Sequence, residues 1–251
     1  MQKEEAFILK IAGLKARVLP NFCSTRQYCR NYLAEGPEDL QIEVTEEAMA
    51  FEQAMLDREA AEEGWKRRQF TPPFLERAVI QRAFAEALAL RDTLLLHGST
   101  VAVDGQAYLF TASCGQGKST HTRLWREVFG ARAVMVNDDK PFLRRTEAGF
   151  LVCGSPFSGK HGLDSNVCLP LKGICILRRG PENRIHRIGA EEAAEMLTHQ
   201  TYMPLDPAGE KQTQKLLRML MTAVPLWSLT CTKDPEAAKI SYEAMATDVV
   251  N

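Results

Sequence analysis

The chain has 251 residues, of which 45% are hydrophobic, so it can bury a sizeable core without disulfides or metals. Its 31 basic and 32 acidic residues give a formal net charge of −1, which excludes the basic field typical of nucleic-acid or membrane-surface proteins. The seven cysteines show no C-x-x-C spacing, and this scattered, odd set indicates reduced thiols rather than a disulfide framework or zinc site. The N-terminal stretch has charges among its apolar residues, and no run approaches the ~20 apolar residues of a membrane span. We therefore expect a cytoplasmic protein whose partners include neither nucleic acid nor membrane.

Residues 1–68 read as a small α+β region. Strand-like runs at 6–11 and 14–19 flank Ala12-Gly13 and predict a hairpin, and residues 39–45 alternate like a further strand. Ser24 is an N-cap candidate for a short helix between the hairpin and that strand.

Two longer helices are predicted next. Thr45 can cap a helix that ends at Gly64, and Pro72-Pro73 mark the start of another. The linker between the two helices separates the N-terminal region from a larger domain, residues 69–251. We expect the apolar stripe of the first helix to be core; it comprises Ala48, Phe51, Met55 and Leu56.

In the larger domain, strands are predicted from Leu94 onward. Three β-like runs follow, with Asp104-Gly105 between two of them as a tight-turn signal, and residues 119–130 read as a helix. A strand, a glycine-containing loop and a helix thus follow one another. In this context the N–H groups of the loop can surround an anion, and the positive end of the helix dipole can stabilise its charge.

The loop reads TASCGQGKST over residues 111–120. It matches the phosphate-loop pattern G-x-x-x-x-G-K-[ST] at Gly117, Lys118 and Ser119, whereas Ala112 replaces the first glycine. Alanine is acceptable there if its φ is negative, and Gly115 and Gly117 supply flexible backbone near the phosphates. A glycine-rich turn with a surface lysine is the alternative. The candidate nucleotide-binding residues are Ser113, Cys114, Gly115, Gln116, Gly117, Lys118, Ser119 and Thr120.

Two carboxylates end the next hydrophobic strand. Asp138 and Asp139 close the run AVMVNDD, and two acids at the end of a buried strand are costly unless a cation lies beside them. Magnesium is the natural partner, with Ser119, Asp138 and Asp139 as its expected ligands. One carboxylate can then accept a proton from an attacking hydroxyl. An exposed N-D-D-K turn is the alternative.

A polar loop, GSPFSGKHGLDSN, covers residues 154–166. Lys160 in this loop could neutralise a migrating phosphoryl group, and a solvated surface loop is the alternative. The buried strand that follows ends in Arg178-Arg179, which are either surface charges or contacts to phosphate or substrate. The C-terminal third predicts two further strands and three helices.

Three landmarks together resemble the HPr kinase/phosphorylase superfamily, whose nucleotide core is related to that of PEP carboxykinase. They are His97 in LHGS, the loop ASCGQGKST, and Asp138-Asp139 in VNDD. The resemblance covers residues 90–180 well and implies an α/β fold with a twisted mixed β-sheet. It also implies that Asp138 is the base and that His97 lies near the reacting phosphates, although His97 alone could equally be a satisfied histidine at a strand end. The signature that docks HPr is missing, which puts HPr in doubt as the substrate.

The expected function is an ATP- and Mg-dependent kinase that transfers the γ-phosphoryl group to a hydroxyl of a small molecule or peptide. Asp138, His97 and Lys160 are its expected catalytic residues. GTP or pyrophosphate as donor is left open, and a carboxykinase-like reaction is less favoured because its extra metal ligands are missing. A non-catalytic nucleotide-binding sensor or scaffold is the alternative from another class. The family's tendency to assemble implies a homo-oligomer.

Overall fold

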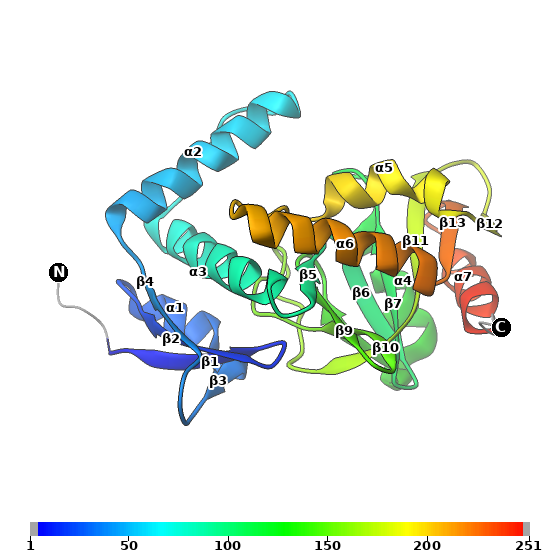
Figure 1. The fold of residues 1–251 in the computed structure, drawn as a ribbon. Coiled ribbons are helices and arrows are strands. Elements are labelled where there is room, and N and C mark those ends of the chain that lie inside the picture. The colour runs from blue at the N-terminus through cyan, green and yellow to red at the C-terminus, as the bar shows by residue number, and fades with distance from the viewer. Residues whose placement is uncertain (1–4, 248–251) are drawn as a thin grey trace. The chain divides into compact units, whose positions relative to one another are not determined.

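The structure is a computed structural model that describes residues 5–247. By its contacts the chain divides into two compact units, Met1–Ala87 and Leu88–Asn251. The expected boundary between residues 68 and 69 lies inside the first unit, in the segment joining helices α2 (Glu46–Glu62) and α3 (Pro72–Ala89). The α/β fold with a mixed sheet that the sequence predicts is confirmed (Figure 1).

The first unit holds a four-stranded sheet in the order β3-β1-β2-β4. The predicted hairpin is confirmed, because β1 pairs antiparallel with β2 and the turn residues Ala12 and Gly13 have φ values of 48° and 88°. Positive φ at both positions is the geometry of a type I′ turn, which matches the twist of the flanking strands. The strands are β1 (Phe7–Ile11), β2 (Leu14–Leu19), β3 (Leu33–Ala34) and β4 (Leu40–Glu43).

Of the two N-caps predicted in this unit, one is confirmed. Thr45 caps α2 as predicted, because its hydroxyl accepts from the Ala48 N–H at 3.2 Å. The shorter helix, α1 (Cys23–Tyr28), follows Phe22 without a side-chain cap, so the prediction of Ser24 as N-cap is wrong. A 3-10 turn (Arg30–Tyr32) continues that segment.

The apolar stripe of α2 is not buried, which corrects the prediction that it is core. Phe51 and Met55 are each 39% exposed and Ala48 and Leu56 are only half-buried, whereas Glu52 and Gln53 are buried. The polar face points inward because Glu52 forms an ion pair with Arg82 of α3 and Gln53 bonds to the backbone at positions 68 and 70. Specific polar contacts, rather than the hydrophobic stripe, therefore fix the orientation of α2.

The second unit is built on a curled mixed sheet in which β5-β9-β10-β11-β7-β6-β8 are neighbours, with β13 beside β11 and β12 beside β13. The strands are β5 (Thr93–Leu95), β6 (Ser99–Val103), β7 (Gln106–Thr111), β8 (Ala133–Asn137), β9 (Phe142–Thr146), β10 (Gly149–Cys153), β11 (Cys168–Arg179), β12 (Arg184–Arg187) and β13 (Leu226–Cys231). The helices are α4 (Lys118–Phe129), α5 (Ala190–Gln200), α6 (Pro207–Ala223) and α7 (Glu236–Thr247), with a 3-10 turn at Gly130–Arg132. Within residues 5–247, no helix combines the length and apolarity needed to cross a membrane.

The strand directions bring several strand ends to one edge of this sheet. β7 pairs parallel with β11, and β11 pairs parallel with β13. β7 and β8 both pair antiparallel with β6, so they also share a direction. The C-terminal ends of β7, β8, β11 and β13 therefore lie at the same edge, the position at which open α/β sheets bind ligands.

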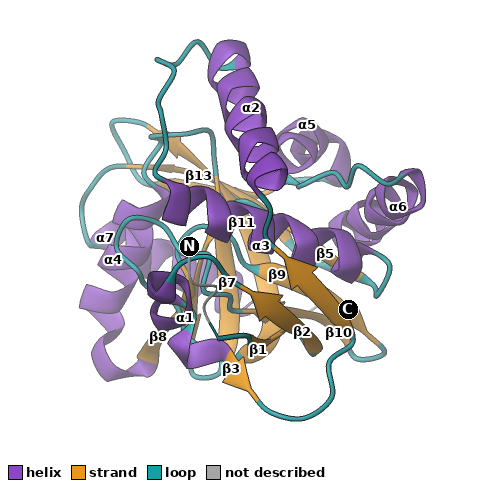
Figure 2. Cartoon of the chain, turned by 90° about the vertical axis from the view of Figure 1, so that its left-hand side faces the viewer, coloured by secondary structure: helices purple, strands orange, loops and turns teal. Residues whose placement is uncertain are grey.

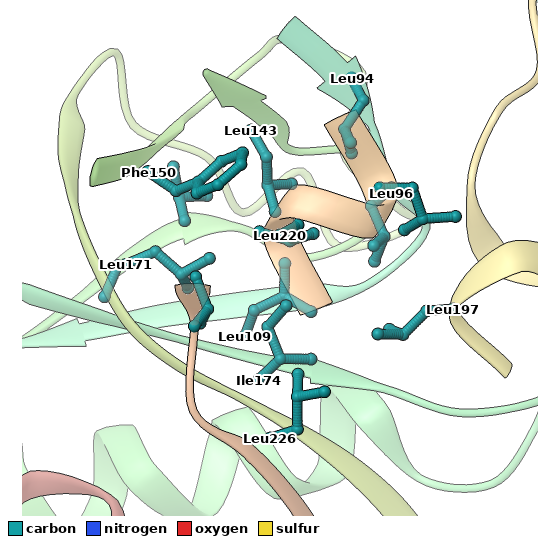
Figure 3. Packing of buried hydrophobic residues seen from close by; sticks show 14 of the residues in the cluster. Leu94, Leu96, Leu109, Leu143, Phe150, Leu171, Ile174, Leu197, Leu220 and Leu226 are labelled. Atoms are coloured by element: carbon teal, nitrogen blue, oxygen red, sulfur yellow. The ribbon is translucent and has the colours of Figure 1, made fainter. Parts of the chain in front are cut away.

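Successive residues of the central strands face two different hydrophobic cores in alternation. Leu109 of β7 faces one core with Leu197 of α5 and Leu220 of α6 (Figure 3). The next residue, Phe110, faces the other core with Trp125 of α4. Figure 2 shows the strands between these two helix layers, with α4 and α7 to their left and α5 and α6 to their right. Helices therefore cover both faces of the sheet.

A disulfide joins Cys153 and Cys168, so the prediction of reduced thiols is wrong for this pair. These residues are direct register partners on antiparallel β10 and β11, with Cα atoms 4.0 Å apart. Their sequence separation of 15 carries no recognisable signal, because only the pairing of the strands brings the sulfurs together. The other five cysteines, all within the described residues, lie outside this disulfide.

Candidate functional site

The loop between β7 and α4 has the backbone of an anion-binding turn. Gly115 and Gly117 have φ values of 73° and 111°, and an added Cβ at either would meet nothing within 4 Å. Glycine is therefore required there by backbone conformation rather than by space. Ala112 is not among the described residues with positive φ, so its presence in place of the first glycine needs no left-handed backbone. The loop leads into the N-terminus of α4, whose partial positive charge adds to that of the loop N–H groups.

Lys118 begins α4 and folds back over this loop. Its side chain is buried, and Nζ donates to the Ala112 carbonyl oxygen at 2.8 Å. Burial lowers the pKa of Lys118, while the negative charge of Asp139 acts in the opposite direction. The structure thus brings the ammonium group of the loop within electrostatic reach of the carboxylates that follow β8.

Asn137 shapes the chain immediately after β8. Its Oδ1 accepts from the N–H groups of Asp139 at 2.8 Å and Lys140 at 2.6 Å, and its Nδ2 donates to the Ser155 carbonyl oxygen at 2.8 Å. A side-chain-to-backbone turn of this kind fixes the bend that presents the two Asp residues. Asn137 is 0% exposed and Asp138 is 4% exposed, so an exposed N-D-D-K turn does not describe this segment.

His97 faces Asp139 across the site, with Nε2 3.0 Å from Oδ1. Its backbone is held by Thr111, whose Oγ1 donates to the His97 carbonyl oxygen at 2.9 Å. Burial lowers the pKa of His97, against the raising effect of its hydrogen bond to Asp139. Burial alone would raise the pKa of Asp139, but the His97 hydrogen bond and the charges of Lys140 and Lys118 outweigh it. The pKa of Asp139 therefore lies below its ordinary value, and this carboxylate stays ionised.

Asp138 has a different environment from its neighbour. Its Oδ1 accepts from the Gly159 N–H at 2.6 Å, and a Cβ on Gly159 would lie 3.3 Å from that oxygen. Burial raises the pKa of Asp138, and the charge of Asp139 adds to the rise, while the Gly159 hydrogen bond and His161 lower it. Two adjacent carboxylates thus have pKa values pushed in opposite directions, as expected for an acid–base group beside an electrostatic one.

The loop between β10 and β11 brings Gly159 to Asp138. Asp164 of this loop pairs with Asn137 in an isolated bridge, and Ser158 Oγ donates to Asp164 Oδ2 at 2.8 Å. Lys160 follows Gly159 directly and is exposed. The loop is therefore an ordered part of the site, and Lys160 is attached to it beside Asp138.

The two arginines at the end of β11 are both exposed but differ in their contacts. Arg179 Nη2 donates to the carbonyl oxygen of Gly115 in the phosphate loop. Because successive strand residues point to opposite faces, Arg178 is directed away from that contact. Only Arg179 of this predicted pair is joined to the loop.

Ser119, the remaining expected metal ligand, is exposed in the first turn of α4. Within residues 5–247, no three His, Cys, Asp or Glu side chains form a cluster that could hold a metal by itself. Magnesium nevertheless fits, because it usually binds one or two carboxylates together with substrate phosphates and water. Asp138 is buried with a raised pKa, so its carboxylate is one whose charge a cation would stabilise.

The sequence does not single out Asn137, Ser155 or Gly159, although each helps to build the site. The signal for Asn137 is its type and place, since asparagine after a strand commonly bonds to the backbone two residues on. Ser155 and Gly159 carry no such local signal, because their contacts cross from one loop to another.

A family model described as SynChlorMet cassette protein ScmC matches residues 77–226, which is more than half of the chain and includes the phosphate loop and both Asp residues. Among curated proteins, none matches this sequence. One similar solved structure is the Hpr(Ser) kinase/phosphatase from Coxiella burnetii, at 11% sequence identity and a TM-score of 0.35. The similarity covers 61% of this chain and 98% of that one. The chain itself belongs to the ScmC family of SynChlorMet cassette proteins.

Proposed function

We propose that this protein is an ATP- and magnesium-dependent kinase that transfers a phosphoryl group to a hydroxyl of a small molecule or peptide. One observation carries the proposal. A glycine loop with an inward-folded lysine and a pair of carboxylates with oppositely shifted pKa values meet at one sheet edge. Phosphoryl transfer needs little else, because its catalysis rests on positioning and on electrostatic stabilisation.

The loop would hold the phosphates of the nucleotide. Backbone N–H groups of the loop and of the first turn of α4 would bind the anion, and Lys118 would exchange its hydrogen bond with the Ala112 carbonyl for one with a phosphate oxygen. Ser119, Asp138 and Asp139 would hold magnesium, which neutralises charge on the phosphates when bound.

Asp138 would act as the base. It accepts the proton of the acceptor hydroxyl while that oxygen attacks phosphorus, and its raised pKa makes it a better proton acceptor than an ordinary aspartate. His97 keeps Asp139 in place through their hydrogen bond. Lys160 and Arg179 supply positive charge toward the migrating phosphoryl group.

Calorimetric titration with ATP and ADP, with and without magnesium, tests the binding half of the proposal. We expect magnesium-dependent binding by the wild type and at least about tenfold weaker binding by Lys118→Ala, because a charge-assisted hydrogen bond is lost. A folded wild-type protein that binds neither nucleotide would refute the proposal.

Transfer from γ-labelled ATP to free serine and short serine peptides tests the chemistry. Asp138→Asn should abolish transfer and leave ATP affinity largely intact, because Ser119 and Asp139 would still hold magnesium. Asp104→Asn, which changes an exposed carboxylate in the β6–β7 turn, should alter neither transfer nor affinity. Transfer that survives in Asp138→Asn would remove this residue from the role of base. A wild type that binds ATP but labels no acceptor would support the non-catalytic sensor instead.

A further inference from the structure

A groove of about 530 Å³ lies in the first unit, beside the short strand β3. Its lining comes from residues 6–8 at the start of β1 and residues 33–36 around β3, together with Arg17 of β2 and Arg26 of α1. All of these residues belong to the first unit, whereas the phosphate loop belongs to the second. The volume falls within the range of about 300–1,000 Å³ that is typical of ligand sites.

The register of the sheet shows that the groove opens at a strand edge. Ile8 is paired with Arg17, so these two side chains lie on one face of the sheet. Phe7 lies on the opposite face, and so does Leu33, which is paired with Leu9. All four lining residues among these contact the groove, and a groove that reaches side chains of both faces lies at the edge of a sheet rather than on top of one face.

The strand that covers this edge of β1 is shorter than β1 itself. β1 pairs with β2 over all of Phe7–Ile11, but β3 pairs with it at two residues only. After β3 the chain leaves the strand conformation at Gly36, which has a φ of 92°, and Lys15 Nζ holds the Glu35 carbonyl oxygen at 2.7 Å. Within the described residues, the edge of β1 at Phe7 therefore has no strand beside it on the β3 side.

The charged groups of the lining are mainly cationic. Arg17 and Arg26 are both exposed, and Glu35 is the acidic residue among the lining residues. Arg26 pairs with Glu5 at 3.3 Å, but the Glu5 side chain is 88% exposed, and surface ion pairs of this kind contribute little to stability. A ligand carboxylate could therefore replace Glu5 at low cost.

Two lysines extend this positive charge along the hairpin. Lys10 and Lys15 are directly opposite each other, on the face that carries Arg17. Like charges in this arrangement repel, and the bond from Lys15 to a backbone carbonyl leaves its charge uncompensated. An anionic ligand beside this face would reduce the repulsion.

The dimensions of the groove fit a short extended segment. A residue in a strand takes up roughly 160 Å³, from a rise of about 3.3 Å, a strand spacing of about 4.8 Å and a sheet spacing of about 10 Å. The groove therefore holds about three residues of an added strand. Alternate side chains of that strand would point to opposite faces, one set toward Arg17 and the other toward Leu33, which is 39% exposed.

We propose that this groove binds an extended peptide segment in which acidic and apolar residues alternate, and that the segment adds to the sheet as a continuation of β3. Its backbone would pair with the edge of β1, its carboxylates would bond to Arg17 and Arg26, and its apolar side chains would cover Leu33. The inference goes beyond the proposed function and does not depend on it, because it uses no residue of the phosphate site.

Fluorescence anisotropy of the full chain with a fluorescein-labelled peptide of alternating valine and glutamate tests the inference. Two further labelled peptides are compared, one with lysine in place of glutamate and one with proline in place of a central valine. We expect the valine-glutamate peptide to bind at least about tenfold more tightly than either, because the first loses charge-assisted bonds and the second loses a backbone donor.

Three results of this comparison would overturn the inference. They are no binding of the valine-glutamate peptide, equal binding of the lysine peptide, and equal binding of the proline peptide, which would mean that carboxylates bind without strand addition. Succinate that displaces the peptide with an affinity equal to that of the peptide itself would overturn it in the same way.

Variants and hydrogen exchange locate the binding. Arg17→Ala should weaken peptide binding about tenfold, whereas Arg30→Ala, which removes an exposed arginine outside the lining, should leave it unchanged. Equal losses would indicate general attraction between opposite charges and contradict the assignment. Bound peptide should also slow hydrogen exchange in a fragment that covers residues 5–9 and not in one from α2. Unchanged exchange in the first fragment would exclude strand addition at β1.

Discussion

Reduction of the Cys153–Cys168 disulfide should destabilise the second unit and leave the phosphate site unchanged. The sequence separation of the two cysteines is 15, and a crosslink that closes a loop of this length stabilises a fold by roughly 3 kcal/mol by restricting the unfolded chain. The folded loop has other supports. The Gly154 N–H donates to the Val167 carbonyl oxygen at 2.9 Å, and the Gly159 N–H holds Asp138 independently of the sulfurs.

The assay is urea unfolding followed by tryptophan fluorescence, with and without a phosphine reductant. Trp125 and Trp227 are both buried in the second unit, so their emission reports its unfolding. Cys168→Ser is the control, because it should match the reduced wild type and ignore the reductant. ATP affinity, measured on the same samples, should not depend on the redox state.

A loss of less than about 1 kcal/mol on reduction would refute the reasoning, because it would mean that the crosslink hardly restricts the unfolded chain. A fall in ATP affinity on reduction would show instead that the loop needs the disulfide to reach Asp138.

Asp138→Asn should raise the thermal midpoint at neutral pH. Because the folded-state pKa of Asp138 lies above its ordinary value, the ionised carboxylate destabilises the fold at neutral pH. The gain in thermal midpoint should therefore vanish below the unfolded-state pKa of the carboxyl group. Calorimetry that shows no gain at neutral pH would contradict this raised pKa. The pKa of His121, lowered by burial from 6.5 to about 3, predicts stability that falls as the pH drops below about 6.5, by up to about 1.4 kcal/mol per pH unit. His121→Gln should flatten this slope in urea titrations over that range, and an unchanged slope would exclude His121 as its origin. Arg179→Ala, which loses the contact with Gly115, should bind ATP roughly tenfold more weakly in calorimetry. Arg178→Ala is the matched control, and equal effects of the two variants would contradict the assignment.

The sequence by itself determines those features that depend on neighbouring residues. Asp104-Gly105 specifies a tight turn, and its φ values of 51° and 79° follow from residues that tolerate a left-handed backbone. The strand, glycine loop and helix around Lys118 are likewise local, because glycine spacing and helix formers act within a few residues.

Only the tertiary structure decides the features that join distant segments. The disulfide depends on the register of β10 and β11, and the exposed stripe of α2 depends on the ion pair between Glu52 and Arg82. The opposite pKa shifts of Asp138 and Asp139 also arise from folding, since burial raises the pKa of Asp138 whereas the hydrogen bond to His97 and nearby lysines lower that of Asp139. Local pattern therefore predicts which elements form and which residues bear charge. Burial and long-range hydrogen bonds decide what each charge can do, because both arise only when the chain has folded.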